Sequence, residues 1–262
     1  MEKEIDGILS SGRLLPGAAA KLKGKLMFAA SQLWGKVGRA FLRPLSERQY
    51  SRECWDKLDR SLVLALQGWL QLLKHAPRRT LAPFSNEKVE WVLFTDGYTP
   101  DQRFGETGDS MIGAVLFKAD GSVPPRYLSE VVPAQVVKDW RARANQISMV
   151  ELIAPIVAFH RWKDVLEGRK TLVLIDNESA EGALVKGYSS KEDACEALSH
   201  FWLEVADVRG FIYIERIPTD ANPADLPSRP NKCDGLEKWG WVRDRACEWP
   251  EPGSGGRAWV KF

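Results

Sequence analysis

The chain has 262 residues, 44% of them hydrophobic and 27% charged, which is the composition of a globular protein able to build a sizeable core. It has no uncharged apolar run approaching the roughly 18 to 20 residues that span a bilayer, and its N-terminus lacks an apolar signal core. We therefore expect an intracellular protein, cytoplasmic or nuclear, with no membrane partner. The cysteines form no C-x-x-C pair, so we predict reduced thiols and neither a disulfide frame nor a zinc site. They are Cys54, Cys195, Cys233 and Cys247.

The net charge of +2 is unevenly distributed along the chain. Residues 1–88 hold 16 Lys and Arg against 8 Asp and Glu, whereas the remainder holds 21 against 27. Two interpretations of the basic first part stay open. It is either the solvated surface of amphipathic helices or a phosphate-binding platform beside a cation-binding part.

Residues 1–75 are predicted to form a small helical domain. Apolar residues recur at steps of three or four in Ser51–Lys74, as on one face of a helix. A second helix is predicted over Leu14–Ser31, where Pro16 suits a first-turn position. Residues 76–88 carry two prolines and are the predicted linker to the next domain.

Basic residues of the helical domain interleave with Trp34 and Phe41. We consider them candidate contacts to nucleic acid, with an ordinary amphipathic surface as the alternative. They are Lys21, Lys25, Lys36, Arg39 and Arg43.

The stretch V-E-W-V-L-F-T-D-G at residues 89–97 predicts a strand that ends in an acid. By the alternation of strand side chains, Val92, Phe94 and Asp96 share one face. A carboxylate beside two large apolar residues is costly unless a cation compensates it, because the charge loses its hydration. Asp96 is therefore the first candidate for a functional site.

Two further acids lie where core residues or buried strand ends are expected. The helix predicted over Asn145–Trp162 places Glu151 on its apolar face. The short apolar run Thr171–Ile175 predicts a strand covered on both faces, and it is followed by Asp176. Functional sites of open α/β sheets gather at the carboxyl ends of such strands.

The remaining elements complete an α/β order over residues 89–230. They are strands over 111–118, 126–132 and 211–217, a helix over 190–209, and a helix start at Asn222-Pro223 that carries the fourth acid, Asp225. The predicted order is β-β-β-α-β-α-β-α, with the first three strands in an antiparallel meander. Residues 231–262 form a Trp-rich C-terminal extension, and the sequence leaves open whether it packs on the domain.

Taken singly, each of the four acids has an ordinary explanation, such as a turn, a helix cap or an interaction with a helix dipole. Brought together, Asp96, Glu151, Asp176 and Asp225 would repel one another, so a cluster of them needs cations. Oxygen ligands favour Mg²⁺ or Mn²⁺ over zinc, and two such ions roughly 4 Å apart can hold the attacking and leaving oxygens of a phosphodiester.

Four motifs resemble the ribonuclease H domain of retroelement reverse transcriptases, of the DIRS type or similar to long-terminal-repeat elements. They are F-T-D-G at 94–97, M-V-E-L at 149–152, L-V-L-I-D-N at 172–177 and N-P-A-D-L-P-S-R at 222–229. The N-terminal stretch, with G-R-A-F-L-R-P-L at 38–45, resembles the thumb and connection of such enzymes. The resemblance implies an α/β, ribonuclease H-like fold with a mixed five-stranded sheet, preceded by a small helical domain.

For function, the resemblance implies a D-E-D-D site of the four acids that binds two Mg²⁺ ions, with Mn²⁺ able to substitute. The site would cut the RNA strand of an RNA–DNA hybrid, and Asn177 and Arg229 would contact nucleic acid beside it. No Y-x-D-D polymerase motif is present, so a polymerase palm and fingers would come from elsewhere. Two alternatives stay open: a non-catalytic nucleic-acid-binding remnant of a reverse transcriptase, and a DNA-cutting nuclease of the same fold.

Overall fold

The computed structural model describes residues 1–51, 56–76, 88–101, 107–143, 145–229, 232–233, 235–244 and 249. These residues group into two compact units. A helical unit holds the described parts of Met1–Pro83 and Lys186–Ala206, and a sheet unit holds those of Phe84–Val185 and Asp207–Phe262. Outside the described residues lie Cys54, Cys247, most of the predicted linker 76–88 and nearly all of the extension beyond residue 244. No described helix is both long enough and apolar enough to cross a membrane.

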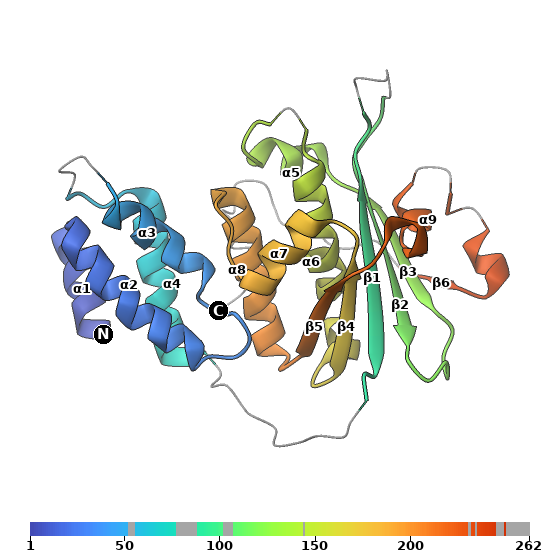
Figure 1. The fold of residues 1–262 in the computed structure, drawn as a ribbon, viewed down its shortest axis with the longest axis horizontal. Helices are drawn as coiled ribbons and strands as arrows, with labels where there is room; N and C mark the ends of the chain where they lie inside the picture. Colours follow the sequence, from blue (N-terminus) through green and yellow to red (C-terminus); the bar gives the residue numbers. More distant parts are fainter. Residues whose placement is uncertain are drawn as a thin grey trace. The chain divides into compact units, whose positions relative to one another are not determined.

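The helical unit is built from helices (Figure 1) around a core of aliphatic and aromatic side chains. They are α1 (Glu2–Ser11), α2 (Pro16–Ser31), η1 (Ala40–Leu42), α3 (Arg43–Gln49), α4 (Arg60–His75) and most of α8 (Glu192–Asp207). Pro16 is the first residue of α2, which its fixed backbone angle favours. The helix predicted over Ser51–Lys74 begins too early. α4 starts after Asp59, whose carboxylate caps the helix by accepting from the Leu62 N–H at 2.8 Å.

The sheet unit is organised on six strands in the order β5-β4-β1-β2-β3-β6 (Figure 1). They are β1 (Trp91–Tyr98), β2 (Met111–Lys118), β3 (Arg126–Val131), β4 (Lys170–Ile175), β5 (Phe211–Arg216) and β6 (Val242–Arg243). β1, β2 and β3 form the predicted antiparallel meander, whereas β4 and β5 extend the sheet in parallel with β1. The predicted α/β class, mixed sheet and strand-helix order are confirmed. The count of five strands is wrong, because β6 pairs with β3 and is too short to leave a pattern in the sequence.

In the described part of the sheet unit, six helical segments follow or precede these strands. They are α5 (Ala134–Asp139), α6 (Ile147–Leu166), α7 (Glu178–Lys186), η3 (Thr219–Ala221), α9 (Asp225–Ser228) and η4 (Leu236–Trp239). The apolar periodicity predicts neither α5 nor α7, because helices of six and nine residues are too short to show a clear pattern. α6 has 20 residues, continues through Pro155, and packs chiefly against β1 and β2. Asn222 does not cap α9 as predicted, since that helix begins only at Asp225.

The first part of the predicted C-terminal extension packs on the sheet unit. Leu236 belongs to a buried cluster with β2 and β3, and the Trp241 ring packs edge to face on Phe117 with centroids 5.6 Å apart. Just after β6, the Asp244 carboxylate accepts hydrogen bonds from Arg126 of β3 and Trp162 of α6. The chain up to residue 244 is thereby attached to both the sheet and its main helix.

Candidate active site

Asp96 lies near the carboxyl end of β1 and is buried, with 3% of its surface exposed. Its cross-strand partner on β2 is Gly113, so these two positions share one face of the sheet. On the other side of β1, Thr95 pairs with Ile175 of the parallel strand β4. β4 ends at Ile175, so Asp176, the residue that follows it, comes beside Asp96, the residue that follows Thr95 on β1.

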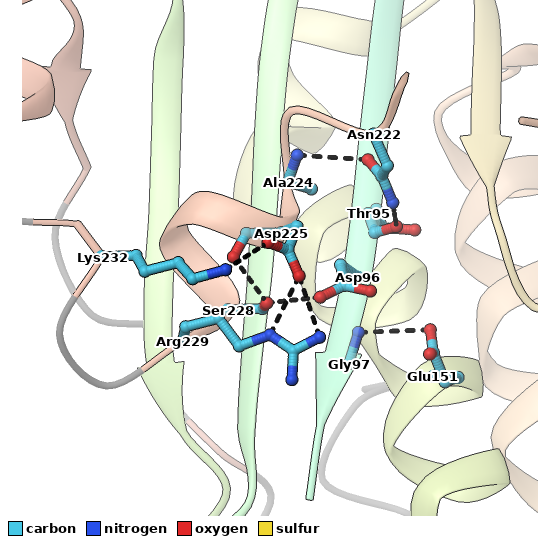
Figure 2. Close-up of polar contacts among 10 residues, drawn as sticks. All are labelled: Thr95, Asp96, Gly97, Glu151, Asn222, Ala224, Asp225, Ser228, Arg229 and Lys232. Carbon is cyan, nitrogen blue, oxygen red and sulfur yellow. Dashed lines mark hydrogen bonds and ion pairs between the residues drawn. The ribbon is translucent and has the colours of Figure 1, made fainter. Parts of the chain in front are cut away.

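Glu151 reaches the same place from helix α6. A Cβ atom on Gly97 would lie 2.7 Å from the backbone nitrogen of Glu151, closer than real Cβ contacts come. Glycine at position 97 therefore lets α6 approach β1 closely. The Gly97 N–H donates to the Glu151 carboxylate at 3.2 Å, and Glu151 is 7% exposed. The acid on the apolar helix face is thus turned toward the strand end (Figure 2).

Asp96, Glu151 and Asp176 form one cluster of carboxylates from two strands and a helix. Each offers an oxygen, and these atoms all lie within 4.8 Å of one another. The Oδ1 atom of Asp176 is buried and has no hydrogen-bond partner in the described part of the chain. Three carboxylates at this spacing, one of which has a buried oxygen without a partner among the described residues, suit a hard divalent cation such as Mg²⁺ or Mn²⁺.

Without a cation, Glu151 and Asp96 retain their protons more strongly than exposed acids do. Burial raises the pKa of Glu151 from 4.5 to about 9, and the carboxylates of Asp96 and Asp176 add to the shift. Burial also raises the pKa of Asp96 from 3.8 to about 6, against the hydrogen bond from Ser228, which lowers it. A bound divalent cation would reverse both shifts, because it favours the ionised carboxylate.

Asp225, the fourth predicted acid, is the first residue of α9 and is already ion-paired (Figure 2). Its Oδ1 accepts from the Arg229 Nε at 2.9 Å, and its Oδ2 accepts from the Lys232 Nζ at 2.8 Å. Burial opposes ionisation of Asp225, but the bonds from Lys232 and Arg229 outweigh it and lower its pKa. Among the described residues, the group of acids within 4.8 Å of one another does not include Asp225. Its role as a metal ligand stays a prediction.

A cavity of about 260 Å³ opens in front of the three clustered acids. Its wall includes Arg229, whose guanidinium lies 4.9 Å from the centre of the Tyr98 ring in a cation–π contact. Asn177 lines the same cavity and caps α7, its Oδ1 accepting from the Ala180 N–H at 3.0 Å. Further wall residues are Gly97, Thr99, Ile147 and Thr219. The two residues of the sheet unit predicted to contact nucleic acid thus both face the cavity of the acids.

The basic residues predicted as a nucleic-acid face of the helical unit are largely engaged within that unit. Three of them donate to partners there: Lys25 to the Glu4 carboxylate at 2.8 Å, Arg39 to the Lys186 carbonyl at 3.3 Å, and Arg43 to the Ser190 carbonyl at 3.1 Å. Lys21 is exposed, and Lys36 also has an interaction partner. Their contact with nucleic acid stays a prediction.

The site also contains residues that the sequence-based interpretation does not single out. The Ser228 hydroxyl donates a short hydrogen bond to the Oδ2 atom of Asp96, and the Asn222 amide donates to the β1 backbone at 3.0 Å (Figure 2). The sequence signal that could have identified Ser228 is its spacing from Asp225. Ser228 and Arg229 follow Asp225 by three and four residues, so on a helix all three side chains lie on one face.

No protein-family model and no curated protein matches this sequence. Two solved structures are similar. Ribonuclease H1 from the halophilic archaeon Halobacterium salinarum is 19% identical with a TM-score of 0.39, and the match covers 56% of this chain and 98% of that one. The N-terminal ribonuclease H domain of a Mycobacterium tuberculosis protein, solved as a fusion with maltose-binding protein, is 16% identical with a TM-score of 0.36, over 58% of this chain and 99% of that one. At these identities and TM-scores the two matches carry no argument about function, which has to be inferred from the site.

Proposed function

We propose that this protein is a metal-dependent endonuclease that hydrolyses the RNA strand of RNA–DNA hybrids. One observation carries the proposal. Three carboxylates from β1, α6 and β4 converge within 4.8 Å at a cavity, and one of their buried oxygens has no partner among the described residues. Burying like charges together destabilises a fold, so such a cluster is best explained by a cation that it binds. The four sequence motifs that resemble retroelement ribonuclease H domains support the choice of substrate.

Asp96, Glu151 and Asp176 would hold two Mg²⁺ ions, and Mn²⁺ can substitute. When bound, such ions activate a water molecule and stabilise the leaving 3′ oxygen of the phosphodiester. The chain orients its own ligands, since the Gly97 N–H fixes the Glu151 carboxylate.

Asp225 is proposed as the fourth ligand, which requires its carboxylate to release Arg229 and Lys232. Arg229, stacked on Tyr98 in the cavity wall, would then bind a phosphate of the substrate through two N–H groups. Asn177 would contact the nucleic acid beside the acids. This arrangement places a cationic group where a nucleic-acid backbone has to approach the carboxylates.

The wider assignment is a segment of a retroelement reverse transcriptase. Residues 1–75 would be a thumb- or connection-like region that adds basic contacts to the hybrid, and residues 76–88 a linker. Residues 89–230 would be the ribonuclease H-like domain and residues 231–262 its extension. A polymerase palm and fingers would come from elsewhere, in the cytoplasm or the nucleus.

Cleavage of an end-labelled RNA–DNA hybrid in Mg²⁺ tests the proposed function. Wild-type protein should cut the RNA strand, and Asp176→Asn should not, because a neutral amide replaces a charged ligand. The matched control is Asp164→Asn, an exposed acid on α6, which should cut like the wild type. Equal cutting by wild type and Asp176→Asn would refute the assignment of the site.

The same assay separates the two alternatives. Hybrid binding that survives Asp96→Asn, with no turnover by the wild type in Mg²⁺ or Mn²⁺, would indicate a non-catalytic binding module. Preferential cleavage of a DNA junction over the hybrid and over double-stranded RNA would indicate a DNA-cutting nuclease of the same fold.

A further inference from the structure

The residues from Asn222 to Ser228, which include α9, clamp β1 at two adjacent points near its carboxyl end (Figure 2). The Asn222 Nδ2 donates to the Thr95 carbonyl at 3.0 Å, while its Oδ1 accepts from the Ala224 N–H at 3.1 Å. One residue further along β1, the Ser228 hydroxyl donates to the Asp96 carboxylate. Asn222 is 5% exposed and Ser228 is fully buried. One contact therefore holds the backbone just before Asp96, and the other holds the acid itself.

This clamp depends on a glycine of the neighbouring strand. A Cβ atom on Gly113 would lie 2.6 Å from the Ala224 carbonyl oxygen and closer still to the Ser228 nitrogen. Helix α9 therefore rests directly on the backbone of β2, opposite Asp96 in the strand register. A side chain at position 113 would push α9 outward and carry Ser228 away from Asp96.

We propose that Ser228 is a positioning residue that fixes the Asp96 carboxylate for cation binding, an inference that rests on the proposed function. Among the described residues, Ser228 is the one hydrogen-bond donor to this carboxylate. The terminal torsion of an aspartate is broad, so the carboxylate is oriented only if one of its oxygens is held. With Oδ2 bound to a buried hydroxyl, the other oxygen is left to join Glu151 and Asp176.

The three clustered acids are thus supported in different ways. The Glu151 carboxylate is held by the backbone N–H of Gly97, and the Asp96 carboxylate by the Ser228 hydroxyl. Asp176 keeps a buried oxygen with no partner in the described part of the chain. Two acids are therefore oriented before a cation arrives, and partners that orient a metal ligand typically change metal affinity by about 10- to 100-fold.

Calorimetric titration with Mn²⁺, without nucleic acid, tests this role. Ser228→Ala should weaken Mn²⁺ binding by about 10- to 100-fold. Ser228→Cys should bind with intermediate affinity, because a thiol is a weaker donor than a hydroxyl. The control Ser199→Ala removes another buried hydroxyl, one that donates to the Glu196 carbonyl at 2.7 Å, and should bind Mn²⁺ like the wild type. Unchanged affinity in Ser228→Ala would overturn the proposal.

A second comparison separates positioning from loosening of the fold. Asn222→Ala removes the backbone half of the clamp but leaves the hydroxyl on Asp96. If the two variants lose similar amounts of melting temperature, Ser228→Ala should still lose more Mn²⁺ affinity than Asn222→Ala. Equal losses of Mn²⁺ affinity would show that Ser228 has only a structural role. If Ser228→Ala does not fold, the Mn²⁺ affinity of Ser228→Cys tests the proposal instead. A wild-type Mn²⁺ affinity in Ser228→Cys would then overturn it.

The positioning role and the proposed function can fail separately. A wild type that binds Mn²⁺ but leaves the hybrid intact refutes the nuclease, while weaker binding by Ser228→Ala still supports the positioning role. A wild type that cuts the hybrid, with unchanged Mn²⁺ affinity in Ser228→Ala, refutes the positioning role alone. A wild type that binds no Mn²⁺ refutes both.

Discussion

Two buried carboxylate sites of the sheet unit are built in opposite ways. The Asp244 side chain is 8% exposed, and its oxygens accept from Arg126, Arg161 and Trp162 at 2.6 to 3.1 Å. Burial opposes its ionisation, but the bonds from Arg126 and Trp162 outweigh it and lower its pKa. This acid joins β3, α6 and the segment after β6, and it is matched by fixed cations.

Among the described residues, no cationic side chain forms a hydrogen bond or ion pair with the cluster of Asp96, Glu151 and Asp176. The described donors to the first two are a serine hydroxyl and a backbone N–H, and burial raises the pKa of both. The difference teaches how to distinguish the two kinds of buried acid. A buried acid that stabilises the fold is ion-paired with cationic side chains of the protein. Buried acids that line a cavity without such partners are suited to bind a cation from solution.

The largest expected effect that would test this contrast is on activity. Asp96→Asn removes a charged ligand, so hybrid cleavage should fall on the order of 1000-fold, since a bound metal supplies several kcal/mol of stabilisation in the transition state. The metal-free free energy of unfolding should stay equal or rise, because repulsion with Asp176 is relieved. Initial cleavage rates and urea unfolding in EDTA measure the two quantities. An Asp96→Asn variant that cuts the hybrid at the wild-type rate would contradict the proposed role of Asp96 as a metal ligand.

Asp244→Ala should show the reverse pattern. The free energy of unfolding should fall by about 2 to 4 kcal/mol, because two arginines and the Trp162 N–H lose their acceptor. The arginine side chains are about 30% exposed, which limits the loss. Cleavage by molecules that remain folded should be unchanged. Urea unfolding beside the exposed control Asp164→Asn measures this, and a loss no greater than the control's would contradict the structural role.

The pH dependence of the same variant sharpens the comparison. Because the pKa of Asp244 is lowered from 3.8, its contribution to stability is present above that value and is lost as the pH falls through the lowered pKa. Wild-type protein should therefore lose more stability in acid than Asp244→Ala does. If the free energies of unfolding of the two proteins fall in parallel as the pH is lowered, Asp244 is not the group responsible.

Glu151→Gln should give the smallest effect, with the opposite sign. The folded-state pKa of about 9, against 4.5, means that the folded chain holds a proton that the unfolded chain releases between these values. The contribution of Glu151 to metal-free stability is then greatest below pH 4.5 and is lost as the pH rises toward 9. Glutamine cannot ionise but still accepts from the Gly97 N–H, so the variant should gain about 1 to 3 kcal/mol at pH 8. A wild-type stability that does not change from about pH 5 to 9 in EDTA would contradict this prediction.

Much of the sheet could be predicted from the sequence because its strands are short apolar runs bounded by turns. β2 has the predicted bounds, Met111–Lys118, and β4 differs from its prediction by one residue. The convergence of three acids followed from similar reasoning. Asp96 and Glu151 each occupied a position where an apolar side chain was expected, and Asp176 ended a buried strand.

Other features depend on contacts that no local pattern encodes. Ser228 meets Asp96 across 132 positions of sequence, and only because α9 rests on Gly113. The ion pair between Asp225 and Lys232 joins α9 to a residue beyond the end of this helix. Two-residue β6 is held by tertiary packing and has no alternation of its own.

A crystal soaked in Mn²⁺ tests the central claim most directly. Anomalous density should show one ion bounded by Asp96, Glu151 and Asp176, and a second about 4 Å away. The Asp225 carboxylate should then have turned from Arg229 toward the second ion. A crystal with Mn²⁺ bound elsewhere and none among the three acids would contradict the account.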